Sequence, residues 1–180
     1  MPDDDRLHHV LAEIQRRGGI GSSASLPDEI EHARRFVAAI PEDASLLVDL
    51  GSGGGLPGLV IAADRPALRV VLVERRAKRA DLLSYGARAL QATDRIEVVA
   101  TDVEDVIRAV LAGDRPTADV VTARSFGPLV LVLSSAAPLL RPGGRVIVSL
   151  PPDDRDAGIV AHDAFEQAIR VDGMLVAVRR

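Results

Sequence analysis

The sequence of 180 residues contains no cysteine, which excludes a disulfide framework, thiolate ligands for zinc and a cysteine nucleophile. It also lacks any uninterrupted run of about 18 apolar residues, so no segment is suited to cross a membrane as a helix. Residues 2–5 are Pro-Asp-Asp-Asp, whereas a secretory signal would be basic and then apolar. From these absences we expect a cytoplasmic protein without membrane contacts.

An excess of positive charge is absent as well. The chain has 22 Lys and Arg against 26 Asp and Glu, for a net charge of −4, and Lys78 is its single lysine. A dedicated nucleic-acid-binding protein usually carries a basic excess, so any contact with a polyanion must be confined to a local patch. The densest basic segment contains Arg65, Arg69, Arg75, Arg76, Lys78 and Arg79. A solvated helix start, balanced by neighbouring acids, is the alternative interpretation of this segment.

What the sequence does contain is enough apolar material for one compact domain, with 47% hydrophobic residues. Residues 1–44 form a predicted N-terminal helical extension, with helices over 6–17 and 27–40. From residue 45 to 180 short apolar runs alternate with helical segments. The predicted strands are 46–50, 70–73, 96–99, 120–121 and 146–148, and the predicted helices are 56–63, 77–91, 103–112 and 127–140. Such alternation is typical of a doubly wound parallel sheet.

The C-terminal part breaks this alternation. Residues 166–171 and 174–179 flank the turn pair Asp172-Gly173, which is a hairpin signature. We therefore predict an α/β fold with a doubly wound, mostly parallel, seven-stranded Rossmann-like sheet and an antiparallel C-terminal hairpin, preceded by the short N-terminal helices. This arrangement is that of the class I methyltransferases rather than that of the standard dinucleotide-binding domains.

The first candidate site is a glycine-rich loop between a predicted strand and a predicted helix. It reads Val-Asp-Leu-Gly-Ser-Gly-Gly-Gly-Leu-Pro-Gly over residues 48–58. Both a dinucleotide and S-adenosylmethionine bind to such loops at helix N-termini. Asp49 precedes Gly51, Gly53 and Gly55, and its carboxylate would attract the ammonium group of S-adenosylmethionine but would repel a pyrophosphate. The loop therefore favours S-adenosylmethionine as the cofactor.

Three further strand ends carry candidate residues. Glu74 ends the second strand, where it would accept hydrogen bonds from ribose hydroxyls or else pair with Arg75 or Arg76 at the surface. Asp102 follows the third strand, where it would recognise adenine or else cap a helix. Arg124 ends the fourth strand and would meet a ligand, or else form a structural bridge to Asp49 or Glu74.

Four motifs together resemble the GidB/RsmG family of class I S-adenosylmethionine-dependent methyltransferases, which modify guanine N7 in small-subunit ribosomal RNA. The motifs are residues 48–58, then Glu74 with Lys78-Arg79 and Leu82-Leu83, then Val103-Glu104-Asp105, and residues 119–126 (Asp-Val-Val-Thr-Ala-Arg-Ser-Phe). They occur in family order over about residues 45–150. The ending Gly-Leu-Pro-Gly and the Ala-Arg-Ser-Phe strand end are the most specific parts.

The resemblance implies roles for particular residues. Gly51 and Leu56 would line the methionine and sulfonium part of the cofactor, and Val103 and Glu104 would flank its adenine. Arg124 would lie at the junction of cofactor and substrate as a positioning group for catalysis. Phe126 would stack on the target base or else pack in the core. Ribosomal RNA or the small ribosomal subunit is the implied partner.

Several positions depart from the family pattern on the substrate side. Asp102 stands where the family usually has arginine, and Leu150-Pro151 replaces a segment with lysine. These changes leave open a small molecule or protein as the methyl acceptor, or a cofactor-binding protein without activity. A nicotinamide oxidoreductase is a further alternative, although Tyr85 and Lys78 lie in one predicted helix, far in sequence from the expected site. The four histidines have no metal-ligand spacing, so we expect no metal site and solvated histidines.

Overall fold

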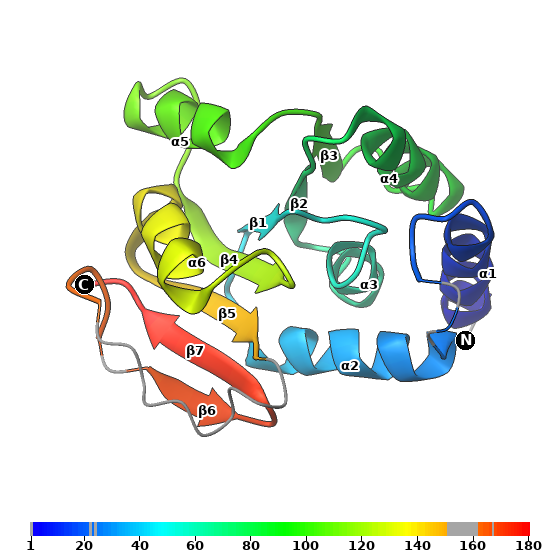
Figure 1. The fold of residues 1–180 in the computed structure, drawn as a ribbon, viewed down its shortest axis with the longest axis horizontal. Helices are drawn as coiled ribbons and strands as arrows, with labels where there is room; N and C mark the ends of the chain where they lie inside the picture. The colour runs from blue at the N-terminus through cyan, green and yellow to red at the C-terminus, as the bar shows by residue number, and fades with distance from the viewer. Residues whose placement is uncertain (1, 22, 24, 151–161, 167) are drawn as a thin grey trace.

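The computed structural model describes residues 2–21, 23, 25–150, 162–166 and 168–180 (Figure 1). The helices are α1 Pro2–Arg16, α2 Leu26–Ala39, α3 Gly58–Asp64, α4 Ala77–Ala89, α5 Val103–Leu111 and α6 Leu129–Ala136, with a short 3-10 helix, η1, at Ala137–Leu139. The strands are β1 Leu46–Leu50, β2 Arg69–Val73, β3 Ile96–Val99, β4 Ala118–Arg124, β5 Leu140–Ser149, β6 Ile169–Val171 and β7 Met174–Val178.

The strands form one seven-stranded sheet in the order β3-β2-β1-β4-β5-β7-β6. β1 to β5 pair in parallel, and β7 pairs antiparallel with both β5 and β6. Strand order reverses between β1 and β4, and the carboxyl ends of both strands meet there. Crevices at such reversals are where open α/β sheets bind ligands. The predicted fold, with its C-terminal hairpin, is confirmed.

Helices cover both faces of the sheet, so the inner strands are apolar on both sides. Apolar residues of α1 to α4 pack on one face, and those of α5 and α6 pack on the other (Figure 1). In β1 the alternation is direct: Leu47 belongs to the first core and Val48 to the second. The carboxyl edge between these layers stays open for ligands.

The two N-terminal helices pack into the same core as the sheet. Leu7, Leu11 and Ile14 of α1 are fully buried, as is Phe36 of α2. Each predicted helix presents one apolar stripe, and that stripe is the face that packs against the rest of the chain. α2 runs from beside α1 toward β7 (Figure 1). Its residues Glu29 and His32 contact Arg124 and Ser149 at the carboxyl edge of the sheet.

Several strand and helix boundaries differ from the predictions: α1 begins at Pro2 rather than at residue 6, α6 ends at Ala136 rather than at residue 140, and β6 begins at Ile169 rather than at residue 166. β4 and β5 extend well beyond the short apolar runs at 120–121 and 146–148, because pairing continues through polar positions up to Arg124 and Ser149. α3 begins at Gly58 rather than at residue 56, since Gly55 to Pro57 still belong to the turn. In the part of the chain that the structure describes, no helix is long and apolar enough to cross a membrane.

Candidate functional site

The glycine-rich loop leaves β1 in a conformation that only glycine adopts readily. Gly51 has φ +63°, and Gly53 and Gly55 also have positive φ. A Cβ atom on Gly51 would lie 2.8 Å from the ring of Phe126, so a second reason for glycine is the close approach of that ring. The loop therefore brings backbone rather than side chains to the carboxyl ends of β1 and β4.

Asp49, the residue before the last of β1, is buried next to this loop. Its side chain is 1% exposed, its Oδ1 accepts a 2.7 Å hydrogen bond from the Thr122 hydroxyl, and its Oδ2 has no hydrogen-bond partner among the described residues. Burial raises its pKa to about 6, although the Thr122 and Ser52 hydroxyls and the N–H of Gly58 counteract that rise. Asp49 lines neither of the two cavities described below, and its predicted contact with a ligand ammonium stays a prediction.

Glu74 at the end of β2 is a second buried carboxylate, with 5% exposure. Its Oε2 accepts a 3.0 Å hydrogen bond from the Gly53 N–H, and its Oε1 accepts one of 2.8 Å from the Arg76 N–H. The alternative of a solvated charge paired with Arg75 or Arg76 is therefore wrong. Glu74 instead ties the glycine loop to the end of β2.

Glu74 forms part of the wall of a cavity of about 330 Å³. The predicted residues Gly51, Asp102, Val103, Glu104 and Phe126 also line it, together with Arg75, Arg76 and Arg79. The cavity thus spans the ends of β1, β2 and β4 and the start of α5. Asp102 is the N-cap residue of α5, but its side chain makes no capping hydrogen bond and instead lies 3.8 Å from the Arg75 guanidinium.

A second cavity, of about 310 Å³, lies beside the first and shares Gly51, Arg79 and Ser125 with its wall. Gly53 and Leu56 line it from the glycine loop, and Gly19, Ile20 and Gly21 line it from the segment between α1 and α2. Gly55 lines neither cavity; it is buried and turns the chain toward α3. The N-terminal extension therefore completes the pocket, which the sequence did not predict.

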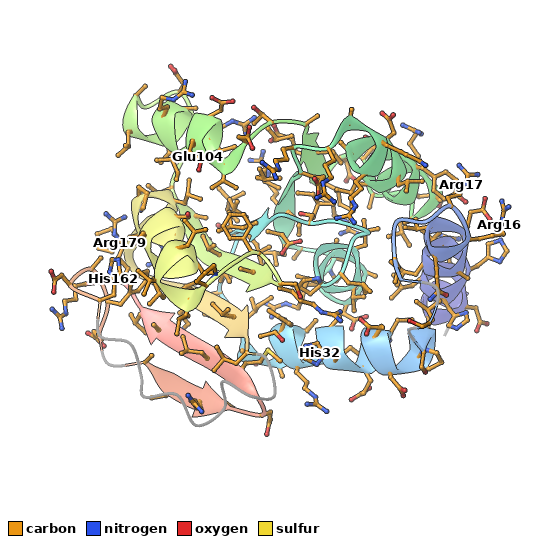
Figure 2. The ribbon with its side chains drawn as sticks, viewed as in Figure 1. Arg16, Arg17, His32, Glu104, His162 and Arg179 are labelled. Carbon is orange, nitrogen blue, oxygen red and sulfur yellow. The ribbon has the colours of Figure 1, made fainter. Side chains whose placement is uncertain are left out.

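A third cavity, of about 440 Å³, lies on the other side of Arg124. His32, Phe126, Ser149 and Leu150 contribute to its wall. Phe126 lines the first cavity as well, and it also packs against the core behind it. Figure 2 shows Glu104 on α5 and His32 on α2 at opposite ends of this arrangement, with the strand ends between them. Pro151 and Pro152, which belong to the substrate-side departure, lie outside the described residues.

Arg124 separates the second and third cavities. Its Nη2 donates to Oε2 of Glu29 on α2, and both side chains are partly buried. The predicted alternative of a bridge to Asp49 or Glu74 is wrong, because among the described residues Arg124 forms its ion pair with Glu29 and with neither of those carboxylates. Glu29 lies 95 residues away in the sequence. No local pattern signals that pairing.

His32 is a further residue that sequence analysis did not place in the site. Its Nε2 lies 3.0 Å from the Ser149 hydroxyl, and its ring meets Phe36 edge-on. Burial and the nearby cations of Arg124 and Arg35 lower the pKa of His32. The prediction of a solvated side chain is therefore wrong for His32. Within the described ranges, no group of three or more His, Asp or Glu is arranged to hold a metal ion.

The basic segment divides into two parts in the structure. Arg69 begins β2, and the Arg65 guanidinium donates to the backbone carbonyls of Pro41 and Glu42. Arg75, Arg76 and Arg79 follow the opposite end of β2 and line the first cavity. A single basic surface formed by the whole segment is thus wrong, and the part beside the site begins at Arg75.

Comparison with known proteins identifies the family to which this site belongs. The model of the family described as rRNA small subunit methyltransferase G, GidB, matches residues 29–156. The chain belongs to this family. Proteins named ribosomal RNA small subunit methyltransferase G from Sorangium cellulosum and Salinispora arenicola are 42% and 43% identical to it over 152 and 108 residues.

These alignments cover 79% and 60% of this chain but 62% and 44% of the two relatives, so the chain spans about half the length of these members of the GidB family. Among solved structures, the O-methyltransferase from Bacillus cereus in complex with SAH has a TM-score of 0.72 and 19% identity. That comparison covers 98% of this chain and 91% of the other. At this identity it confirms the fold alone.

Proposed function

We propose that this GidB-family chain is an S-adenosylmethionine-dependent methyltransferase that methylates guanine N7 of small-subunit ribosomal RNA in the cytoplasm. The observation that carries the proposal is the pair of neighbouring cavities along the glycine loop, which share Gly51, Arg79 and Ser125, in a chain that matches the rRNA methyltransferase G family over residues 29–156. A third cavity, on the other side of Arg124, offers a separate binding site for the methyl acceptor.

The residues present fit the cofactor. Glu74 lines the first cavity, where its carboxylate would accept from ribose hydroxyls, and Asp102, Val103 and Glu104 line the same cavity and would surround the adenine. Gly51, Gly53 and Leu56 offer backbone and an apolar side chain to the methionine end. Asp49 and Gly55 act as positioning residues for the loop. When bound, S-adenosylmethionine supplies an electrophilic methyl group on its sulfonium sulfur.

The chain's own part in methyl transfer is to position the acceptor. Guanine N7 carries a free lone pair, so no residue has to remove a proton before attack. The walls of the second and third cavities meet at Arg124, which fixes where an acceptor atom meets the cofactor's methyl group. Phe126 faces the third cavity and offers its ring for stacking on the target base, a contact worth about 1–3 kcal/mol.

The test is transfer of a labelled methyl group from S-adenosylmethionine to small ribosomal subunits that lack the modification. We expect incorporation into ribosomal RNA, with 7-methylguanine as the product on nuclease digestion and mass spectrometry. Binding to the subunit should weaken steeply as salt increases, because phosphate contacts release counterions. The variant Arg124→Gln serves as the matched negative control.

Two outcomes would contradict the proposal in distinct ways. Methyl transfer to a small molecule or a protein, without salt dependence, would retain the cofactor and replace the acceptor. Tight cofactor binding with no transfer to ribosomal particles, ribosomal RNA or other acceptors would mark the chain as a binding protein without activity.

A further inference from the structure

The first turns of α2 contact the carboxyl ends of two adjacent strands, β4 and β5. Glu29 pairs with Arg124, the last residue of β4, and three residues later His32 contacts Ser149, the last residue of β5. Arg124 and Ser149 are themselves register partners between these strands. Residues three apart lie on one helix face, so a single face of α2 fixes both strand ends.

The two terminal nitrogens of the Arg124 guanidinium differ in their hydrogen bonding. Nη2 is engaged by Glu29, whereas Nη1 is buried and has no hydrogen-bond partner among the described residues. A buried donor without a partner is costly and points to a ligand that supplies the acceptor. Arg124 lines both the second and the third cavity, so such a ligand lies at their junction.

We propose that Glu29 is a positioning residue for methyl transfer, which holds Arg124 so that Nη1 alone donates to the acceptor base. The inference rests on the proposed function. Arginine commonly binds guanine with two donors, one to O6 and one to N7. A two-donor contact would occupy the N7 lone pair that has to attack the methyl group. Glu29 occupies an N–H of Nη2 and turns this nitrogen toward α2, so Arg124 donates through Nη1 to O6 and leaves N7 free.

Glu29 is suited to this role because, among the described residues, it is the carboxylate that forms an ion pair with Arg124. Asp49 accepts from Thr122, and Glu74 accepts from the backbone N–H groups of Gly53 and Arg76. Glu29 also lines the second cavity itself, so it holds Arg124 from the side of the cofactor. The acceptor specificity of the site thus depends on a contact from the N-terminal helical extension.

The test is a double-mutant cycle on methyl transfer to small ribosomal subunits, with Glu29→Gln, Arg124→Gln and the double variant. We expect Glu29→Gln to lower kcat about tenfold and Arg124→Gln about a hundredfold, as misplacement and loss of a positioning group do. The double variant should match Arg124→Gln, because Glu29 acts only through Arg124. Thermal unfolding and S-adenosylhomocysteine binding of each variant identify losses that arise from misfolding.

A second measurement tests whether recognition of the base depends on its O6 atom. Small-subunit RNA carrying 2-aminopurine at the methylated position keeps N7 but lacks O6, and inosine keeps both. We expect the wild-type protein to methylate inosine about as fast as guanine and 2-aminopurine at least tenfold more slowly, a preference that Glu29→Gln loses.

Three results would overturn the inference. In the first, Glu29→Gln lowers kcat by the same factor in the Arg124→Gln background as in the wild type. In the second, Glu29→Gln leaves kcat unchanged, or the wild-type protein does not distinguish 2-aminopurine from inosine. In the third, the wild-type protein methylates no RNA, which refutes the proposed function and this inference with it; the first two leave the proposed function standing.

Discussion

The proposed cofactor side, along the glycine loop, and the proposed acceptor side, beyond Arg124, are built in different ways. On the cofactor side, the glycine loop is held by residues of the sheet itself, with Asp49 beneath it and Glu74 bonded to Gly53. On the acceptor side, Arg124 and Ser149 are held by Glu29 and His32, which lie 95 and 117 residues away in the sequence. The glycine loop is thus held from within the sheet, whereas Arg124 and Ser149 are held by α2.

This difference matches the task proposed for each side, which is cofactor binding on one and acceptor positioning on the other. A cofactor is the same molecule in every turnover, so backbone groups and buried carboxylates can fix its place. The acceptor side uses side chains of a peripheral helix, which can change without disturbing the loop. We therefore expect variants on the cofactor side to alter stability and cofactor affinity, and variants of Glu29 and His32 to alter turnover.

The largest expected effect is on the pH dependence of stability through Asp49. Its pKa is about 6 in the folded protein against an ordinary value of 3.8, so the folded state binds the proton more tightly. Ionisation between pH 4 and 6 thus lowers the free energy of unfolding, by about 3 kcal/mol for this shift. Urea denaturation of wild type and Asp49→Asn at pH 4 to 7 measures it. The wild type should lose about this much relative to the variant as pH rises; parallel curves would show that Asp49 does not carry a raised pKa.

The second largest expected effect is on cofactor affinity, through Glu74. Glu74→Ala leaves the N–H groups of Gly53 and Arg76 without their acceptor and removes the carboxylate from the cavity. We expect S-adenosylhomocysteine binding to weaken by about 2 kcal/mol, roughly 30-fold in Kd. Calorimetry measures the change. Glu97→Ala on the neighbouring strand β3, where Glu97 pairs with Arg115, is the matched control and should bind normally. Equal affinities for both variants would remove Glu74 from the cofactor site.

A pair of glycine variants separates backbone strain from the site itself. Gly51 and Gly113 both have positive φ, but a Cβ on Gly113 meets nothing within 4 Å, whereas one on Gly51 meets Phe126. Alanine at either position should cost about 1 kcal/mol of stability through the backbone conformation. Only Gly51→Ala should also weaken S-adenosylhomocysteine binding, since Phe126 has to move. Thermal unfolding and calorimetry distinguish the two, and normal binding by Gly51→Ala would contradict the close packing seen here.

The smallest effect on stability concerns Arg75. Its 3.8 Å contact with Asp102 is exposed, so Arg75→Ala should change stability by less than about 0.5 kcal/mol. If this end of the basic segment contacts RNA phosphate, the slope of log Kd against log salt should fall by about 0.7–0.9. Arg69→Ala, at the opposite end of β2, is the control and should leave the slope unchanged. Equal slopes for both variants would place the RNA contact elsewhere.

The sequence predicts the cofactor side far better than the acceptor side, and the reason is physical. The glycine loop and Glu74 lie at the ends of adjacent strands whose apolar runs identify them, so their meeting follows from the sheet. The Glu29–Arg124 pair depends on how α2 packs, which periodicity does not determine. The same limit explains why β4 and β5 were predicted too short, since their pairing continues through polar positions.

The domain boundary predicted at residue 45 stays a prediction about how the chain divides. In the structure α1 and α2 share one core with α3, α4 and the sheet, and the segment between α1 and α2 lines the second cavity. Part of the N-terminal extension therefore lines the site, which composition and charge did not indicate.

The most direct test of the account is calorimetric titration of the wild-type protein with S-adenosylhomocysteine, beside NADH, and the same titrations of His32→Ala. His32 lines the acceptor cavity alone, so the variant should leave the cofactor side intact. We predict micromolar binding of S-adenosylhomocysteine, about −8 kcal/mol, to both proteins and no binding of NADH. Absence of S-adenosylhomocysteine binding, or preference for NADH, would contradict the account, as would a loss of affinity in His32→Ala without loss of fold.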